Sequence, residues 1–178
     1  MLIAPTREEF TASQSLQTHC DLDHITLLRC STSRAAAGTR LSEPYTLSGL
    51  NSSTAKMTDD VLTVEASFNW TAVDANKAQV FAVECVYELC YRLKEGYKPE
   101  ENEIEAFKNG NAIFNCWPYF REFCQNLTAR MGQMPPAMPL LRVVPKPATL
   151  VKPEANLVNT EAAPPSVAHR RGKKSVDQ

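Results

Sequence analysis

The 178-residue sequence lacks an excess of charge of either sign: 19 lysines and arginines stand against 20 acidic residues, for a formal net charge of -1. A protein that binds nucleic acid through its phosphates normally carries a basic excess, so no nucleic-acid partner is expected. No run of about 18 or more apolar residues occurs, so no membrane span is expected. The amino-terminal residues show no apolar signal region after a positive start, and we therefore expect a cytoplasmic protein.

Catalytic motifs are also lacking. The sequence has no Gly-rich phosphate loop, no HExxH pattern and no serine or cysteine in a nucleophile-elbow context. The histidines, His19, His24 and His169, lie near the two ends of the chain, and nothing places one of them against a nucleophile. Glu84 and Glu88 share a strand face, but a solvated or interface face is favoured over acid–base work. We expect no enzyme activity and no cofactor; an enzyme with a hidden site is only a third hypothesis.

Cysteine motifs are lacking as well, although six cysteines are present. None forms a C-x2-C pair, and without a signal peptide disulfides are not expected. We interpret the cysteines as reduced thiols that mostly fill core positions. The segment from His19 to His24 groups two histidines, a cysteine and two aspartates. Its spacing fits no common zinc-ligand pattern, so no metal is expected there.

Alternation of apolar and polar residues predicts a β-sheet. Residues 62–72 alternate strictly, which puts one face of a long strand in the core and the other in water. Alternation resumes over 81–93 after a polar break at 74–77, and the two segments predict an antiparallel hairpin. Residues 24–34 predict a first strand and residues 44–50 a weak second one, with a loop at 51–56. The expected sheet is four-stranded and antiparallel.

Helices are expected after the sheet. Residues 99–107 predict a short helix with acidic residues in its first turn, interrupted at 109–111. Residues 112–131 predict a longer aromatic helix, in which Pro118 marks a kink or a restart and Gly132 the end. The expected organisation is a flexible polar arm (1–21), an α+β domain with helices backing the sheet (22–143) and a disordered Pro-rich, basic-ended tail (144–178).

The densest apolar stretch runs from Ala112 to Val143 and ends in a loop rich in methionine and proline. Flexible thioethers suit adaptable hydrophobic binding, and prolines hold such a loop open at low entropic cost. A loop of this composition can equally well cover the core. The residues alone leave both interpretations open.

These features resemble the SecB family of chaperones. The resemblance rests on the order of elements over residues 22–143 and on the motif at 117–122, WPYFRE, followed by Met131-Gly132 and a Pro-rich apolar loop. It implies an α+β protomer that assembles as a homotetramer, a dimer of dimers formed through the sheets and the long helix. It also implies ATP-independent binding of unfolded or partly folded polypeptides in an apolar groove.

The resemblance places this groove on the second strand, the start of the aromatic helix and the loop after it. Its expected residues are Tyr45, Leu47, Phe114, Trp117, Met134, Met138, Leu140 and Leu141. Glu84 falls near the acidic face that export members present to the translocation ATPase. Export members are strongly acidic and have a second helix after the loop, whereas this chain is nearly neutral and continues into a Pro-rich tail.

Two binding functions follow. The leading hypothesis is a SecB-like holdase for unfolded polypeptides, with protein export as one route. The alternative is a dedicated interaction protein or chaperone for a single partner, such as the antitoxin of a toxin–antitoxin system. The two departures from the export members favour the dedicated role.

Overall fold

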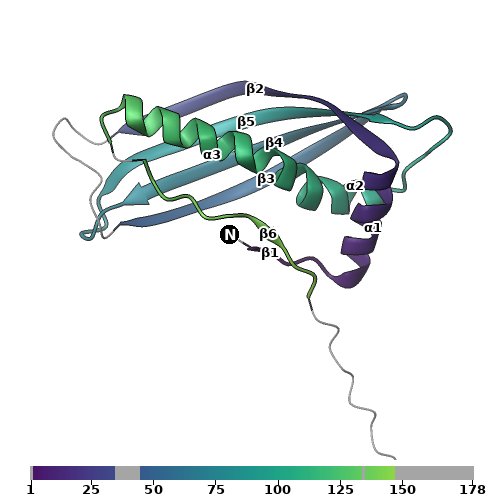
Figure 1. Cartoon of the computed structure of the whole chain (residues 1–178), viewed down its shortest axis with the longest axis horizontal. Coiled ribbons are helices and arrows are strands. Elements are labelled where there is room, and N and C mark those ends of the chain that lie inside the picture. The colour runs from purple at the N-terminus through teal and green to yellow at the C-terminus, as the bar shows by residue number, and fades with distance from the viewer. Residues whose placement is uncertain (1, 35–44, 134, 147–178) are drawn as a thin grey trace, which may run out of the picture. The chain divides into compact units, whose positions relative to one another are not determined.

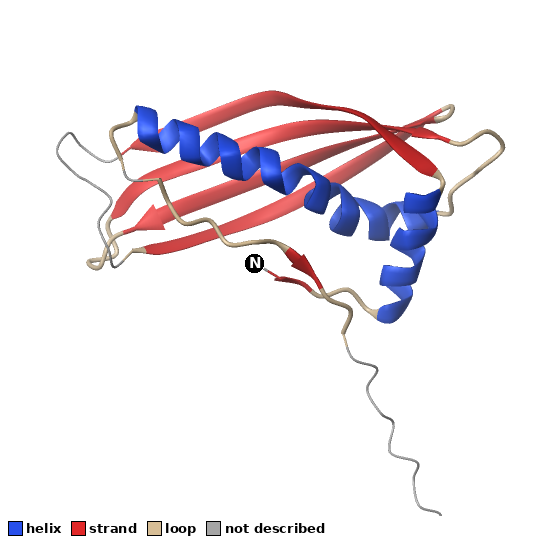
Figure 2. Ribbon diagram, in the orientation of Figure 1, coloured by secondary structure: helices blue, strands red, loops and turns tan. Residues whose placement is uncertain are grey.

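Four long antiparallel strands form the main sheet, in the spatial order β2-β5-β4-β3 (Figure 1). The strands are β2 (Cys20–Arg34), β3 (Thr46–Thr58), β4 (Val61–Val73) and β5 (Gln79–Leu93). The structure is a computed structural model that describes residues 2–34, 45–133 and 135–146. Helices cover one face of this sheet, which confirms the α+β fold expected from the sequence (Figure 2).

The hairpin of β4 and β5 is confirmed and forms the centre of the sheet. The inward residues of β4 are all buried, and they alternate with half-buried or exposed ones along the whole strand. The turn between the strands is closed by Asp74, whose Oδ1 accepts hydrogen bonds from the backbone N–H groups of Asn76 (2.8 Å) and Ala78 (2.9 Å). An aspartate that bonds its own backbone in this way stabilises a turn where strict alternation ends.

Strand β3 is longer than expected, and the loop predicted at 51–56 is wrong. Pairing with β4 continues without a break from Thr46 to Thr58. The strand was not predicted because serines and threonines in this segment give no apolar alternation. An edge strand such as β3 tolerates this composition, since its outward face needs no apolar residues. A tight turn at Asp59-Asp60 follows, where Asp59 adopts a φ of 53°, a conformation that aspartate tolerates better than most residues.

Strand β2 forms the opposite edge and begins at Cys20, earlier than expected. Its pairing with β5 shifts register twice, between Leu22 and His24 and between Leu27 and Arg29. Each shift inserts an extra residue that changes which side chains face the helices. Edge strands are commonly irregular in this way, because a bulge blocks uncontrolled pairing with another chain.

The helical stretch after the sheet is continuous. It consists of α2 (Glu101–Phe107), the π-helical turn η1 (Lys108–Ala112) and α3 (Ile113–Arg130). The interruption expected at 109–111 is therefore wrong: these residues widen the helix by a π-turn instead of breaking it. α3 also continues through Pro118, which lies exposed on the surface of the helix.

Gly132 is confirmed as the cap that terminates α3 after Arg130. Gly132 adopts a φ of 67°, which favours glycine because it has no Cβ. The N–H of Gln133 donates to the Thr128 carbonyl (2.9 Å), and that of Gly132 donates to the Ala129 carbonyl (3.0 Å). This pair of bonds is the Schellman motif, which ends the helix and sends the chain in a new direction.

The segment expected to be a loose polar arm contains helix α1 (Arg7–Thr18), so that prediction is wrong. Thr6 and Glu9 form a reciprocal capping box: the Glu9 N–H donates to Thr6 Oγ1 (3.1 Å), and the Thr6 N–H donates to Glu9 Oε2 (2.7 Å). Leu16 anchors the helix with a fully buried side chain. The helix was not predicted because Leu16 is its one fully buried apolar residue and the segment shows little apolar periodicity. The Thr-x-x-Glu pattern is nevertheless a recognisable start signal.

A second, two-stranded sheet joins the ends of the described chain. β1 (Leu2–Ile3) pairs in parallel with β6 (Arg142–Val143). Two further backbone bonds extend the pairing, from the Val144 N–H to the Ile3 carbonyl (2.9 Å) and from the Lys146 N–H to the Pro5 carbonyl (2.8 Å). Residues 147–178, most of the predicted tail, lie outside the described residues.

Aromatic rings join α3 to the inner face of the sheet. Phe120 stacks on Phe68 with ring centroids 4.6 Å apart, and Trp117 lies against Trp70 at 5.3 Å. Phe107 of α2 meets Tyr91 of β5 edge to face at 4.9 Å. Such ring pairs contribute about 0.5–1.5 kcal/mol beyond the area they bury.

We predict that Phe120→Ala lowers the free energy of unfolding by about 3–5 kcal/mol, because it removes a fully buried ring and leaves a cavity against Phe68. Urea denaturation followed by circular dichroism measures the change. The neighbouring substitution Tyr119→Ala is the matched control, because Tyr119 is 51% exposed. Equal losses for the two variants would contradict this description of the core.

Candidate functional site

The Met/Pro loop turns back after α3 and runs along it, between α3 and the β3 edge of the sheet (Figure 1). Trp117 of α3 donates its Nε1–H to the Pro139 carbonyl (3.1 Å). On the other side, the Ala137 N–H donates to the Tyr45 hydroxyl (2.9 Å), just before β3 begins. Two side chains from distant parts of the chain, Trp117 and Tyr45, thus hold the backbone of a segment whose prolines supply no N–H groups of their own.

We call residues 135–141 the covering segment. Buried and exposed side chains are interspersed along it. Met138 and Leu141 are 5% and 7% exposed and belong to the main core, and Pro136 is also buried. Leu140 points outward and is 63% exposed. The described part of the Met/Pro loop therefore covers the core in this conformation.

The structure brings most of the predicted groove residues together. Tyr45 and Leu47 are half-buried against the core, and Trp117 is buried beside Trp70. Phe114 is 48% exposed on α3 and, with Leu140, is one of the two strongly exposed members. Met134 lies outside the described residues. The roles of these residues in binding remain predictions.

Trp70 also belongs to this region, although its place in the alternation of β4 was the only feature by which it could be recognised beforehand. Its indole ring fills the space above Gly49 of β3, where an added Cβ would lie 2.4 Å from the ring. The Trp70 Nε1–H is buried and has no hydrogen-bond partner among the described residues. An unpaired buried donor costs about 1–3 kcal/mol, so a carbonyl that reached it would be bound favourably.

Glu84 lies on the opposite, outer face of the sheet and is exposed. In register it sits between Asn69 of β4 and Ser31 of β2. The helices and the covering segment are on the other side (Figure 1). A partner at Glu84 would thus approach a different face from a polypeptide bound near Trp117.

Buried thiols and a phenol fill the space between α3 and the sheet. Burial raises the pKa of Cys85 to about 12 and that of Cys116 to about 12. Burial also raises the pKa of Tyr87 well above its ordinary range. These groups keep their protons at neutral pH and serve as small or aromatic core residues.

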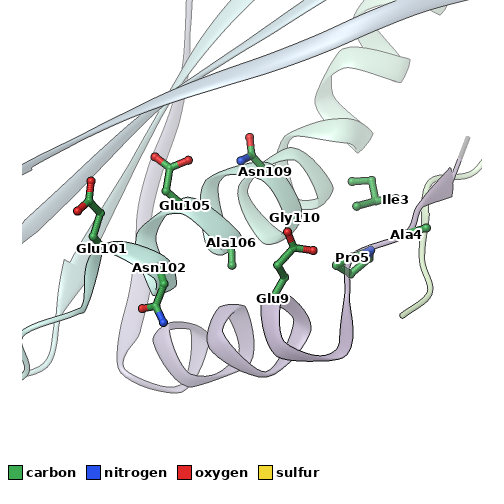
Figure 3. Close-up of a pocket in the computed structure, with 10 residues that line it drawn as sticks. All are labelled: Ile3, Ala4, Pro5, Glu9, Glu101, Asn102, Glu105, Ala106, Asn109 and Gly110. Atoms are coloured by element: carbon green, nitrogen blue, oxygen red, sulfur yellow. The ribbon is translucent and has the colours of Figure 1, made fainter. Parts of the chain in front are cut away.

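A pocket of about 780 Å³ opens between α1, α2 and the amino-terminal strand (Figure 3). Two of its acidic residues are already engaged: Glu9 in the cap with Thr6, whose backbone bond lowers the Glu9 pKa, and Glu105 in an ion pair with Lys108. None of the predicted groove residues lines the pocket. Its described lining contains no histidine, cysteine or serine that could act as a nucleophile or base.

The histidines and acids at 19–24 do not converge on one point. His19 stacks on Tyr97 with ring centroids 4.1 Å apart, and its Nδ1 lies 2.8 Å from the Ser15 carbonyl. His24 instead lies on β2, in register with Cys90 of β5. The sequence cluster is therefore divided between two environments.

This arrangement of a four-stranded sheet, a long helix and a covering segment is the SecB-like chaperone fold. The chain is similar to the Mycobacterium tuberculosis Rv1957 SecB-like chaperone, whose structure is in complex with a ChAD peptide from the Rv1956 HigA1 antitoxin. The two structures superpose with a TM-score of 0.67 at 18% identity, over 76% of this chain and 99% of that one. The likeness confirms the fold that the sequence resemblance implied.

Other comparisons add little. A Streptococcus agalactiae protein of unknown function matches with a TM-score of 0.45 at 9% identity, over 67% of this chain and 96% of that one. No family model matches the sequence, and no curated protein does. Among the described residues, no helix has the length and apolar character needed to cross a membrane.

We predict that Tyr45→Phe accelerates amide hydrogen exchange at Ala137 about fivefold, because it removes the acceptor of the Ala137 N–H at a cost of about 1 kcal/mol. Exchange measured by NMR or mass spectrometry gives the rate. Tyr119→Phe is the control, since Tyr119 is exposed on the surface of α3. Unchanged exchange at Ala137 in Tyr45→Phe would show that this bond does not hold the covering segment.

Proposed function

We propose that this protein is an ATP-independent chaperone of SecB type that binds apolar segments of other polypeptides. The observation that carries the proposal is the fold, which matches a SecB-like chaperone over 99% of that chaperone's length. The exposed apolar side chains on the helix-covered side supply a surface of the appropriate kind. Burial of such surface contributes roughly 25 cal/mol per Å² to the free energy of binding, which would give a holdase its affinity for clients.

The binding surface that we propose consists of Phe114, Leu140 and the covering segment between α3 and β3. Phe114 and Leu140 keep large apolar side chains in water, at 48% and 63% exposure. Behind them lie two indoles, of which Trp117 bonds the covering segment and Trp70 has an unpaired N–H. A client bound against Phe114 and Leu140 would gain an apolar wall, and a client carbonyl that reached the Trp70 Nε1–H would gain a hydrogen bond.

A dedicated partner is the second candidate, and one observation favours it. The Mycobacterium tuberculosis structure with the same fold holds a peptide from an antitoxin. The nearly neutral charge of the present chain also differs from the acidic character of export members. We therefore favour a single polypeptide client, such as an antitoxin segment, over hand-off to a translocation ATPase at Glu84.

We further propose that the protein forms a homotetramer, a dimer of dimers, as the resemblance implies. Strand β2 is an edge of the sheet and carries three leucines, Leu22, Leu27 and Leu28, that are 41%, 37% and 44% exposed. Apolar side chains exposed together along an edge strand suit burial against a second copy. The SecB resemblance also implies a cytoplasmic protein, and we propose that location.

Client binding can be tested without disturbing the core. We predict that Phe114→Ser with Leu140→Ser weakens binding of a reduced, unfolded client at least tenfold, because each lost apolar contact contributes about 1.5–3 kcal/mol when fully buried. The measurements are suppression of client aggregation at stoichiometric ratio and affinity by fluorescence anisotropy. Leu50→Ser is the matched control, since Leu50 is 81% exposed and lies on the outer face of β3.

Three results would separate the possibilities. A folded protein that suppresses no aggregation and binds no unfolded client would contradict a general holdase. If that protein still retained one polypeptide selectively from its own cell extract, the dedicated role would stand. Equal binding by the double serine variant and the parent would show that the surface at Phe114 and Leu140 is wrongly assigned.

Assembly is tested separately. We predict a tetrameric mass by light scattering, and a smaller species for Leu27→Glu, which puts a charge on the β2 edge. Leu50→Glu, on the other edge strand, should leave the mass unchanged. A monomer at micromolar concentration would rule out the assembly that the resemblance implies.

A further inference from the structure

The outer face of the sheet carries a group of side chains that the proposed function does not use. This face is not covered by any helix of the described chain (Figure 2). Most of its residues on β3 and β4 are serines, threonines and asparagines. Where β2, β5 and β4 run side by side, however, four residues with metal-binding side chains are in neighbouring positions: His24, Cys90, Glu88 and Glu65.

A bulge in β2 places His24 opposite Cys90. The register shift between Leu22 and His24 inserts Asp23, so that His24 pairs directly with Cys90 on the outer face. Without the register shift, Asp23 would pair with Cys90, and His24 would pair with Leu89 and face the core. Bulges often redirect a side chain at a functional position, and this one brings a histidine opposite a cysteine.

The geometry suits one small cation. The ligand atoms of His24, Glu88 and Cys90 all lie within 4.8 Å of one another. Bonds of about 2.0–2.3 Å to a tetrahedral zinc ion require ligand atoms about 3.3–3.8 Å apart. Small rotations about side-chain torsions would close this difference, and the partial exposure of Cys90, Glu88 and His24 leaves room for them. Two ligands spaced i and i+2 on one strand, with a third on the next strand, are on the same face of the sheet.

An independent observation also indicates a cation. Glu65 and Glu88 are directly opposite each other on β4 and β5, and like charges in such a pair are destabilising. Neither takes part in any of the ion pairs of the described residues, and neither does Arg29 on the same face of β2. A divalent ion at Glu88 would neutralise this repulsion.

The surroundings favour the histidine and the thiol as ligands. Asp23 Oδ2 lies 3.3 Å from His24 Nδ1, and a carboxylate on one ring nitrogen directs the other toward a metal. The Thr63 hydroxyl lies 4.0 Å from the Cys90 sulfur, within reach of a weak hydrogen bond. These contacts are the supporting groups that metal-binding histidines and thiolates commonly have.

We propose that His24, Glu88 and Cys90 form a binding site for a zinc-like divalent cation on the outer face of the sheet. A nitrogen, an oxygen and a sulfur ligand together suit zinc, whereas calcium and magnesium prefer oxygen alone. The three ligands leave a fourth position for water or for Glu65. The ion links the edge strand β2 to the centre of the sheet.

Sequence spacing could not reveal this site, because its ligands come from strands far apart in the chain. The site does not rest on client binding, since it lies on the face away from α3 and the covering segment. The other thiols near the core are poor competitors. Burial raises the pKa of Cys20 to about 11 and that of Cys116 to about 12, so that both keep their protons near neutral pH.

The test is a titration of the full-length, reduced protein with cobalt(II), followed by displacement with zinc. We expect a one-to-one complex with the near-ultraviolet charge-transfer absorption of a cobalt–thiolate bond. Cys90→Ser should abolish that absorption, and His24→Gln and Glu88→Gln should each weaken cobalt binding at least tenfold. Cys30→Ser is the matched control, because Cys30 is exposed but pairs with Cys85 on the inner face. His19→Gln controls for binding at the start of β2.

Zinc should also raise the melting temperature of the parent protein and of Cys30→Ser, but not that of folded Cys90→Ser. The proposal is overturned if the parent protein shows no thiolate absorption. It is equally overturned if Cys90→Ser retains the absorption, or if Cys30→Ser or His19→Gln removes it. Far-ultraviolet circular dichroism establishes that each variant is folded, so that a lost signal reports on the ligand.

Discussion

The contact between α3 and the central hairpin determines the rest of the structure. Phe120 stacks on Phe68, and Trp117 lies against Trp70, so the helix is fixed over β4 by aromatic rings. Because α3 occupies this position, its Schellman end directs the following chain back along the helix. The covering segment, the exposed Leu140 and the short β1–β6 pair all follow from that direction.

The two faces of the main sheet carry different kinds of side chain. The inner face is apolar and is closed by α3 and the covering segment, with indole N–H groups at its border. The outer face is mostly polar, is covered by no helix of the described residues and concentrates carboxylates, a histidine and a thiol near β5. Period-two alternation makes this division possible, since neighbouring residues of one strand serve opposite surfaces. A change on one face can therefore leave the function of the other intact.

The sequence predicted the parts of the fold in which apolar patterning is strong. The alternation from Leu62 to Ala72 and the helical spacing around Phe120 gave the hairpin and α3, because each buries a continuous face. It missed α1, most of β3 and the β1–β6 pair, which depend on a cap, on edge pairing and on contacts between chain ends. Edge pairing and contacts between chain ends have no local pattern, and the Thr-x-x-Glu cap of α1 is a start signal without a clear apolar helix pattern after it.

The candidate site, like the fold, could be predicted only in part. Trp117, Met138 and Leu141 were recognisable as apolar members of the helix and loop, but their burial depends on the path of the chain after Gly132. Trp70 could not be distinguished from an ordinary core residue, because only the three-dimensional packing leaves its N–H without a partner. The pairing of His24 with Cys90 depends on a bulge, which alternation alone cannot locate.

The β1–β6 pair has a consequence for the order in which the molecule folds. It joins residues 2–3 to residues 142–143, and each strand contributes only two residues to the pairing. The entropic cost of closing a loop rises with its length, and such a short pair forms few hydrogen bonds to offset that cost. The hairpin and α3 can form from contacts much closer in the chain, so we infer that the two ends join late. The same pair should be among the first to open on heating, and the covering segment beside it would then be released while the aromatic core persists.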